Sequence, residues 1–189
     1  MAYAHSANSQ GRRQDLLAHL QAVAELAARF AAPFGAREIA RYLGLWHDLG
    51  KLDPAFQRYL LAAEAGKRGR SPDHKGAGAF LAERHLGMLA LLVQAHHGGL
   101  TSPADLKVWL AERRAAPAIQ AALERAHALL PSLEPAQPLA LPPAAEADPL
   151  AAELWLRLLF SALVDADFLD TEAHFDSQRA AGRGSTPPL

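Results

Sequence analysis

The 189-residue sequence contains no cysteine, which excludes disulfide bonds, thiolate zinc sites and cysteine nucleophiles. It also lacks a long apolar run, because the most apolar stretch, residues 86–95, is too short to span a bilayer. The first residues, MAYAHSANSQGRRQ, do not combine a basic segment with an apolar core as a signal peptide does. We therefore expect a cytoplasmic protein without a membrane partner. The formal net charge of −1 excludes a uniformly basic nucleic-acid coat protein, but it leaves room for local basic contacts.

The composition and length are those of one folded domain. Hydrophobic residues make up 50% of the chain and charged residues 21%, which is typical of globular rather than disordered proteins. A chain of 189 residues fits one domain with or without a tail. We expect the domain to cover residues 1–178 and a flexible tail or linker to cover residues 179–189.

Leucine and alanine recur at helical spacing along most of the chain, whereas β-branched residues are scarce and strand-like alternation never exceeds a few residues. This pattern predicts an all-α fold in the form of a compact helical bundle. Proline and glycine mark most of the expected helix boundaries. A long proline-rich connector is expected over residues 131–149. The predicted helices cover residues 13–32, 36–49, 54–65, 73–85, 87–97, 103–115, 117–130 and 150–168.

The dipeptide His47-Asp48 is the sharpest local feature of the sequence. It lies near the end of a predicted apolar helix, and His47 continues the side that carries Ile39 and Leu43, so its imidazole should point inward. A charged Asp48 beside it is costly in an apolar interior unless it is paired or binds a metal ion. Adjacent helical residues diverge by about 100°, yet both can serve one cluster if the carboxylate bridges two ions. The neighbouring Trp46 is expected in the core rather than as a platform for base stacking.

Further histidines and acids lie on the inward sides of other predicted helices. His96 and His97 end an apolar helix and precede two glycines, which leave room for a ligand, and two neutral imidazoles suit a divalent transition metal. Each of these residues alone can also be a satisfied core histidine or a helix cap. Several inward polar residues on different apolar helices are expensive separately, and a shared metal ion satisfies them together. The further candidates are His19, His74, Asp165, Asp167 and Asp170, whereas His5, His85, His127 and His174 have little supporting context.

The order of these residues resembles the HD superfamily of metal-dependent phosphohydrolases, in which a histidine, a His-Asp pair and a late aspartate follow one another. Gly50-Lys51 after the His-Asp pair strengthens the likeness. Further segments resemble one branch, the HD nuclease domain of type I CRISPR-associated helicase-nucleases, and the likeness covers about residues 4–175. The segments that carry it are AHS at 4–6, HLQAVAELA at 19–27, LWHDLGK at 45–51, HKGAGA at 74–79, HHG at 96–98 and FSALVDADFLDTE at 160–172.

The resemblance implies an HD-type bundle with a metal centre in its core, and an HD nuclease domain over residues 1–178. It suggests two divalent ions and no organic cofactor. Histidine-rich sites favour manganese, iron, cobalt, nickel or zinc over magnesium or calcium. Asp167 is taken as the late aspartate because it occupies the Ala-Asp position of the superfamily, with Asp165 as its rival. The first ion would be held by His19, His47, Asp48 and Asp167, and the second by Asp48 as a bridge with His74, His96 and His97.

The implied activity is metal-dependent hydrolysis of phosphodiester bonds in single-stranded DNA during CRISPR interference. We expect a metal-bound hydroxide to attack the phosphorus in line, with Asp48 bridging the ions and Lys51 neutralising or orienting the phosphate. A solvated lysine at a helix end is the alternative for Lys51. The substrate strand is expected to follow a basic loop, for which a merely solvated loop is the alternative. That loop contributes Lys67, Arg68, Arg70 and Lys75.

The expected partners are a CRISPR-associated helicase and a CRISPR surveillance complex. The sequence carries no Walker-type phosphate loop, so the helicase is either a separate chain or a segment that this sequence leaves out. Two other functions compete with the nuclease. One is an HD-type phosphohydrolase that acts on nucleotides, and the other is a helical binding module whose histidines are structural.

Overall fold

A computed structural model describes residues 1–67, 69–146 and 148–183, and most of these residues lie in helices. The all-α prediction is therefore confirmed. In the described part of the chain, two short strands, β1 (Tyr3–His5) and β2 (Gln14–Asp15), form an antiparallel hairpin that the sequence analysis missed. They are too short to show alternation. The helices are α1 (Leu16–Ala31), α2 (Arg37–Trp46), α3 (Pro54–Glu64), α4 (Gly76–Leu86), α5 (Ala90–Ala95), α6 (Pro103–Arg113), α7 (Pro117–Leu129), α8 (Pro143–Glu146), α9 (Pro149–Phe175) and α10 (Ser177–Arg183), with 3₁₀ helices η1 (Ala32–Phe34), η2 (Leu49–Leu52) and η3 (Gly87–Leu89).

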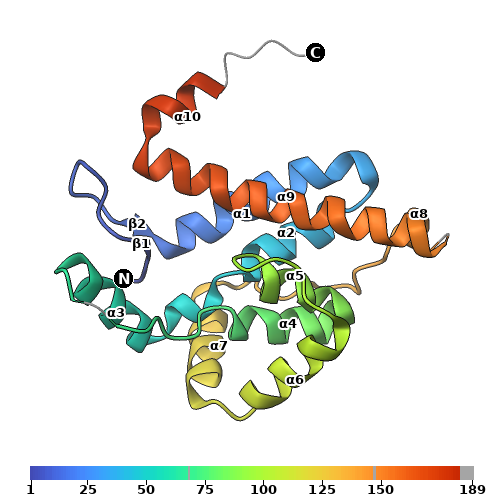
Figure 1. Ribbon diagram of the computed structural model, residues 1–189, viewed down its shortest axis with the longest axis horizontal. Coiled ribbons are helices and arrows are strands. Elements are labelled where there is room, and N and C mark those ends of the chain that lie inside the picture. Colours follow the sequence, from blue (N-terminus) through green and yellow to red (C-terminus); the bar gives the residue numbers. More distant parts are fainter. Residues whose placement is uncertain (68, 147, 184–189) are drawn as a thin grey trace.

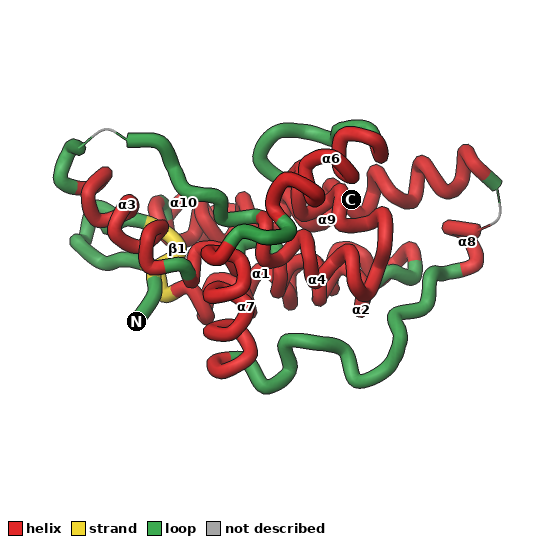
Figure 2. The backbone as a smooth tube through the Cα atoms, turned by 90° about the horizontal axis from the view of Figure 1, so that it is seen from below, coloured by secondary structure: helices red, strands yellow, loops and turns green. Residues whose placement is uncertain are grey.

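The helices form two packed groups that meet along α2. In Figure 1, α9 crosses the molecule beside α1 and α2, and α4 to α7 lie below them. Helix α1 packs against α2 and α9, while α2 also packs against α4, which in turn contacts α5, α6 and α7. Figure 2 shows the connector from α7 to α8 running as a long loop along one side. The core between the two groups is therefore bounded by α1, α2, α4 and α9.

Helix α1 illustrates how the apolar stripe and its cap set a helix. Leu16, Leu20 and Val23 are fully buried along the side that faces α2 and α9, as the helical spacing predicts. The predicted start at residue 13 was wrong, because Gln14 and Asp15 pair with β1 instead. The side chain of Asp15 then accepts the backbone N–H of Ala18, which fixes the first turn.

Caps that are readable in the sequence start three other helices where they were predicted. The Asp53 side chain accepts the Ala55 N–H at the start of α3, with proline in the first helical position. Ser102 and Asp105 form a capping box at the start of α6. Asp148 accepts the N–H groups of Leu150 and Ala151, so α9 begins at Pro149, one residue before the predicted start at 150. These capped boundaries depend on local hydrogen bonds, which explains why the sequence predicts them well.

Boundaries that depend on tertiary contacts were predicted less well. Helix α2 ends at Trp46 rather than at residue 49, and α4 begins at Gly76 rather than at residue 73. The Asp73 side chain accepts the N–H groups of Lys75 and Gly76, and this turn precedes the helix. Helix α9 continues to Phe175 rather than ending at 168, because its last turn packs against the ring of His5 on β1.

Two glycines allow backbone segments around the candidate site to approach closely. A Cβ on Gly78 of α4 would lie 1.8 Å from the carbonyl oxygen of Trp46 at the end of α2. A Cβ on Gly50 would lie 2.5 Å from the carbonyl oxygen of His74, which accepts the Gly50 N–H at 3.0 Å. Trp46 itself is fully buried and donates its ring N–H to Leu133 O. The prediction of Trp46 as a core residue is confirmed.

Helix α10 covers residues 179–183 of the predicted flexible tail. Arg179 and Arg183 on this helix form ion pairs with Glu172 of α9 at 3.0 and 2.6 Å. This part of the predicted flexible tail is therefore helical, and the two ion pairs hold it against α9. The domain boundary at residue 178 stays a prediction, and residues 184–189 lie outside the described residues.

The stretch Gly76–Ala95 is the one segment of the described chain that is long and apolar enough to cross a membrane by length and composition. It extends further than the short apolar run 86–95 noted in the sequence. The stretch is broken near its middle by Gly87, whose φ of 57° ends α4. Most of it is buried in the core against α2, α6 and α7. Helices in the core of a globular domain can be as long and as apolar as a membrane span, so they meet the same criteria.

Candidate metal centre

His47 and Asp48 lie at the end of α2, and both side chains are fully buried. The helix stops at Trp46, and Asp48 leaves helical geometry with φ −119° and ψ 19°. This change of backbone direction turns the carboxylate towards its neighbour's ring instead of away from it. His47 Nε2 and Asp48 Oδ2 therefore lie 3.4 Å apart, although adjacent residues of a continuous helix would diverge.

One oxygen of Asp48 faces a set of side chains from α1, α2 and α9. Oδ2 lies 3.8 Å from His19 Nε2 and 3.4 Å from His47 Nε2. Asp167 Oδ1 of α9 completes the set at 3.5 Å from His19 Nε2 and 3.6 Å from His47 Nε2. We call His19, His47, Asp48 and Asp167 the inner group. Of the two candidate late aspartates, the structure brings Asp167 to this group and leaves Asp165 exposed.

The other oxygen of Asp48 faces histidines that precede α4 and follow α5. Oδ1 lies 3.9 Å from His74 Nε2 and 3.6 Å from His96 Nε2. Asp48, His74, His96 and His97 each offer a ligand atom within 4.8 Å of the others, and we call these four residues the outer group. His97 lies on its exposed side. The two groups share Asp48, one through each carboxylate oxygen, which is the arrangement expected of a bridging residue.

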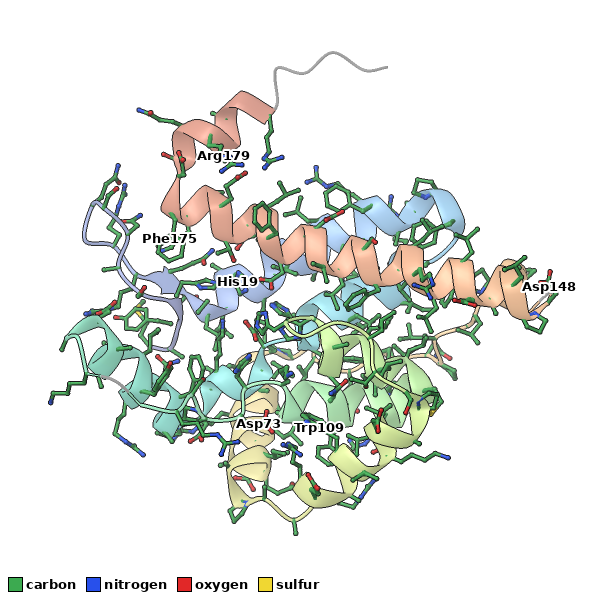
Figure 3. All side chains as sticks on the ribbon, viewed as in Figure 1. His19, Asp73, Trp109, Asp148, Phe175 and Arg179 are labelled. Atoms are coloured by element: carbon green, nitrogen blue, oxygen red, sulfur yellow. The ribbon has the colours of Figure 1, made fainter. Side chains whose placement is uncertain are left out.

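Hydrogen bonds fix the orientation of three of the imidazoles. His47 Nδ1–H donates to Gly44 O at 2.7 Å, and His96 Nδ1–H donates to Val93 O at 2.6 Å. A carbonyl oxygen can only accept, so Nδ1 carries the proton in both rings and Nε2 is the atom that points to Asp48. His19 Nδ1 lies 2.7 Å from Asp170 Oδ2, which orients this ring in the same way. Figure 3 shows His19 between α9 and the lower helices.

Several buried polar atoms of the cluster lack a hydrogen-bond partner. They are both carboxylate oxygens of Asp48, both ring nitrogens of His74 and Nε2 of His96. Burying such atoms without a partner costs about 1–3 kcal/mol each, and native proteins rarely do so without a reason. Imidazole nitrogens and carboxylate oxygens that converge in this way are the donors that divalent transition metals prefer. The cluster therefore fits divalent metal binding.

Lys51 is buried and faces the cluster rather than solvent. Its Nζ lies 2.6 Å from Asp48 Oδ2 in an ion pair that lacks hydrogen-bond geometry. The 3₁₀ helix η2 brings the lysine back over the carboxylate three residues earlier in the chain. The alternative of a solvated lysine at a helix end was therefore wrong.

The charges of the inner group stabilise one another. Although burial favours the neutral acid, Lys51 and His47 hold the pKa of Asp48 well below its ordinary value. Burial opposes the ionised form of Asp167 as well, and hydrogen bonding to His47 lowers its pKa. Burial also disfavours a charged imidazole, yet the carboxylates of Asp48 and Asp167 raise the pKa of His47 to about 10. Without a metal ion, a proton on His47 therefore balances part of the negative charge.

The outer group has the opposite character. Burial lowers the pKa of His74, and burial together with the charge of His96 lowers the pKa of His97 to about 4. Both rings are thus neutral at pH 7, and each keeps a lone pair available for a ligand. Neutral imidazoles beside one ionised carboxylate form a suitable donor set for a divalent cation.

Two residues beside the inner group were underrated by the sequence analysis. His5 of β1 offers a ring nitrogen within 4.8 Å of ligand atoms of His19 and Asp167, and burial lowers its pKa to about 3. The triplet Ala4-His5-Ser6 was the available signal for this residue. Asp170 was noted only as an acid in need of a partner, and that partner is His19. His85, His127 and His174 lie outside the four possible ligand groups of the described residues.

The all-α fold with a His/Asp cluster buried in its core is that of an HD-type metal-dependent hydrolase. Comparison with protein families then gives the particular family. The model of the family "Cas3, HD domain" matches residues 3–167, which is most of the chain, and the chain belongs to that family. It is therefore a metal-dependent HD nuclease domain of CRISPR systems, with a role in CRISPR interference and a DNA substrate. A search of curated proteins found no match.

Proposed function

We propose that the chain hydrolyses phosphodiester bonds of single-stranded DNA during CRISPR interference. It would use two divalent transition-metal ions such as manganese, nickel, cobalt or iron, and no organic cofactor. The proposed partners are a CRISPR-associated helicase and a CRISPR surveillance complex, and the proposed compartment is the cytoplasm. One observation carries the proposal: the two oxygens of Asp48 face two different sets of possible ligand atoms.

In this proposal the inner group and the outer group each hold one ion. The ions supply Lewis-acid activation of a water molecule and of the phosphate, which is the chemistry that the side chains alone lack. Asp48 contributes one oxygen to each group and so fixes their separation. Backbone carbonyls accept the Nδ1 protons of His47 and His96, so Nε2 is the nitrogen that each ring would offer to an ion.

Lys51 and Asp170 support the reaction from beside the ligands. Lys51 is positioned by its ion pair with Asp48, and in the proposal its charge neutralises the phosphate as negative charge develops on it. Asp170 holds the His19 ring in place through Nδ1. Both residues therefore act through position and charge, without accepting or donating a proton in the reaction.

Circular single-stranded DNA is the sharpest substrate for a test, because it has no ends for an exonuclease. The purified protein should linearise it with added manganese or nickel, and EDTA should stop the reaction. His47→Ala and Asp48→Ala should each abolish cleavage and keep a helical circular dichroism spectrum. His127→Ala is the matched control, because this exposed histidine pairs with Glu134 away from the cluster. It should cleave at the wild-type rate.

Three outcomes would overturn the proposal. Cleavage by Asp48→Ala at the wild-type rate would contradict the site. Turnover of free nucleotides without cleavage of DNA would indicate the nucleotide phosphohydrolase instead. A protein that binds no metal on elemental analysis and stays inactive after reloading would be the helical binding module.

A further inference from the structure

A cavity of about 530 Å³ adjoins the outer group at His74. The segment 70–75, which includes His74 of the outer group, forms one wall. Trp109 and Arg113 of α6 form the opposite wall. Figure 3 shows Asp73 and Trp109 on the same part of the molecule, below His19. We call this space the Trp109 cavity. It opens to the surface next to His74, one of the proposed metal ligands.

The lining of the Trp109 cavity favours an anion. Arg70, Lys75 and Arg113 contribute three cations, whereas Asp73 is the one acid in this lining. The carboxylate of Asp73 is already engaged, because Oδ1 accepts the N–H groups of Lys75 and Gly76 and Oδ2 accepts Arg113 Nε at 3.1 Å. Arg113 is also paired with Glu112 at 3.1 Å, and Lys75 Nζ donates to Gln94 O at 2.8 Å. With the charge of Arg113 counted as neutralised by these acids, Arg70 and Lys75 still leave a net positive charge in the lining, which suits a phosphodiester backbone.

The cavity also presents a planar surface of fixed orientation. The guanidinium carbon of Arg113 lies 4.3 Å from the centroid of the Trp109 ring. Arg113 Nη1 donates to Trp109 O at 3.0 Å, and its Nε donates to Asp73, so the guanidinium plane is held in place. Nucleic-acid bases stack on aromatic rings and on arginine planes. Trp109 is half-buried, unlike Trp46 and Trp155, which are 0% and 4% exposed.

We propose that the Trp109 cavity is a nucleotide-binding subsite, in which a base next to the scissile phosphate stacks on Trp109 and Arg113 while Arg70 and Lys75 contact its backbone. The proposal deepens the proposed function and rests on it. A base in a duplex is already stacked on its neighbours, so this subsite selects an unpaired strand. The subsite assigns Arg70 and Lys75 of the predicted basic loop to the substrate path. Lys67 is not part of this lining, and Arg68 lies outside the described residues.

Tryptophan fluorescence tests the subsite without catalysis. The metal-free protein in EDTA is titrated with oligothymidylate, which should quench the emission of Trp109 because it is the accessible one of the three tryptophans. Binding is measured in parallel by the anisotropy of a labelled oligothymidylate. Trp109→Leu should remove the quenching and weaken binding about 5- to 150-fold, since one base stacked on an aromatic ring contributes about 1–3 kcal/mol. A duplex of the same length should not quench the emission.

Three variants complete the design. Trp109→Phe keeps a stacking ring and should keep most of the affinity. Val108→Ala, at a 60% exposed neighbour on α6, is the matched control and should bind like the wild type. Arg70→Gln should weaken binding without changing the quenching, and it should reduce the salt dependence of the affinity by about one unit of slope. Because Arg70 is exposed, this variant remains informative if Trp109→Leu does not fold.

The outcomes separate this proposal from the proposed function. Unchanged affinity of Trp109→Leu, or of Arg70→Gln where Trp109→Leu does not fold, overturns the subsite. So does quenching that persists in folded Trp109→Leu. In either case, cleavage of circular DNA by the wild-type protein would still support the proposed nuclease function. Conversely, a protein that binds oligothymidylate through Trp109 but cleaves no DNA supports the subsite and refutes the nuclease.

Discussion

Gly50 offers a quantitative test of the metal centre. Because it has no side chain, the turn that carries Asp48 can approach the backbone of His74 in the outer group. Its N–H donates to His74 O at 3.0 Å, and a Cβ at this position would lie 2.5 Å from that oxygen. Real Cβ atoms stay beyond 3.0 Å from such neighbours. The substitution Gly50→Ala must therefore move the backbone of His74 away from the turn that carries Asp48 by at least about 0.5 Å.

A displacement of this size matters for a metal site, since ligand distances hold within about 0.2 Å. The outer group should lose affinity, because His74 no longer meets Asp48 and His96 in register. The inner group should keep its geometry, since its ligands come from α1, α2 and α9. Overpacking of this kind costs about 1–3 kcal/mol, which is roughly 2–12 °C in Tm for a chain of this length.

Manganese titration by calorimetry and thermal unfolding in EDTA measure the two effects. The matched control is Gly98→Ala, beside the outer group, because a Cβ there meets nothing within 4 Å. The wild type and this control should bind two ions, whereas Gly50→Ala should bind one ion tightly. The reasoning would be refuted if Gly50→Ala bound two ions with the affinity of the control and unfolded at the same temperature.

Three further predictions concern the inner group. Asp170→Asn should lower manganese affinity about 10- to 100-fold in calorimetry, because Asp170 orients His19; an unchanged affinity would contradict that role. Asp167→Ala should abolish DNA cleavage, whereas the exposed Asp165→Ala should cleave normally, and the reverse result would exchange the two aspartates. The folded pKa of His47, about 10, lies above its ordinary value of 6.5. Its charge therefore stabilises the metal-free protein fully below pH 6.5. In urea unfolding, the difference in free energy of unfolding between the wild type and His47→Gln should decline from pH 6.5 towards pH 10. An increase in that difference over this range would exclude the ion pairing.

The helical class and most helix starts could be predicted from the sequence because they depend on neighbouring residues. The Asp53 and Ser102 caps act within one turn of their helices, and the stripe through Leu16 and Leu20 repeats with the helical period. The hairpin of β1 and β2 and the extension of α9 to Phe175 were missed. The strands have only two or three residues, which is too short for a pattern to show in the sequence. The extension of α9 depends on a contact between Phe175 and His5, which lie more than 150 residues apart in the chain.

The candidate ligands were predicted from residue type and position on apolar helices, since buried imidazoles and carboxylates need partners wherever they occur. The choice of Asp167 over Asp165 rested on a resemblance, because both could lie near the core and helical periodicity did not separate them cleanly. The structure shows where the two side chains lie: α9 packs against α1 so that Asp167 lies 3.5 Å from His19, while Asp165 is exposed.

The sequence by itself determined an all-α chain and which polar residues would be costly to bury, because helical periodicity and desolvation are local properties. Only the tertiary structure decided that the two oxygens of Asp48 face different groups, that Lys51 turns inward, and that Trp109 lines a cavity next to His74. The physical reason is that these relations depend on how α1, α2, α4, α6 and α9 pack across one another. These relations also depend on close backbone approaches such as that between Gly50 and His74. The spacing of residues within a single helix does not encode such approaches.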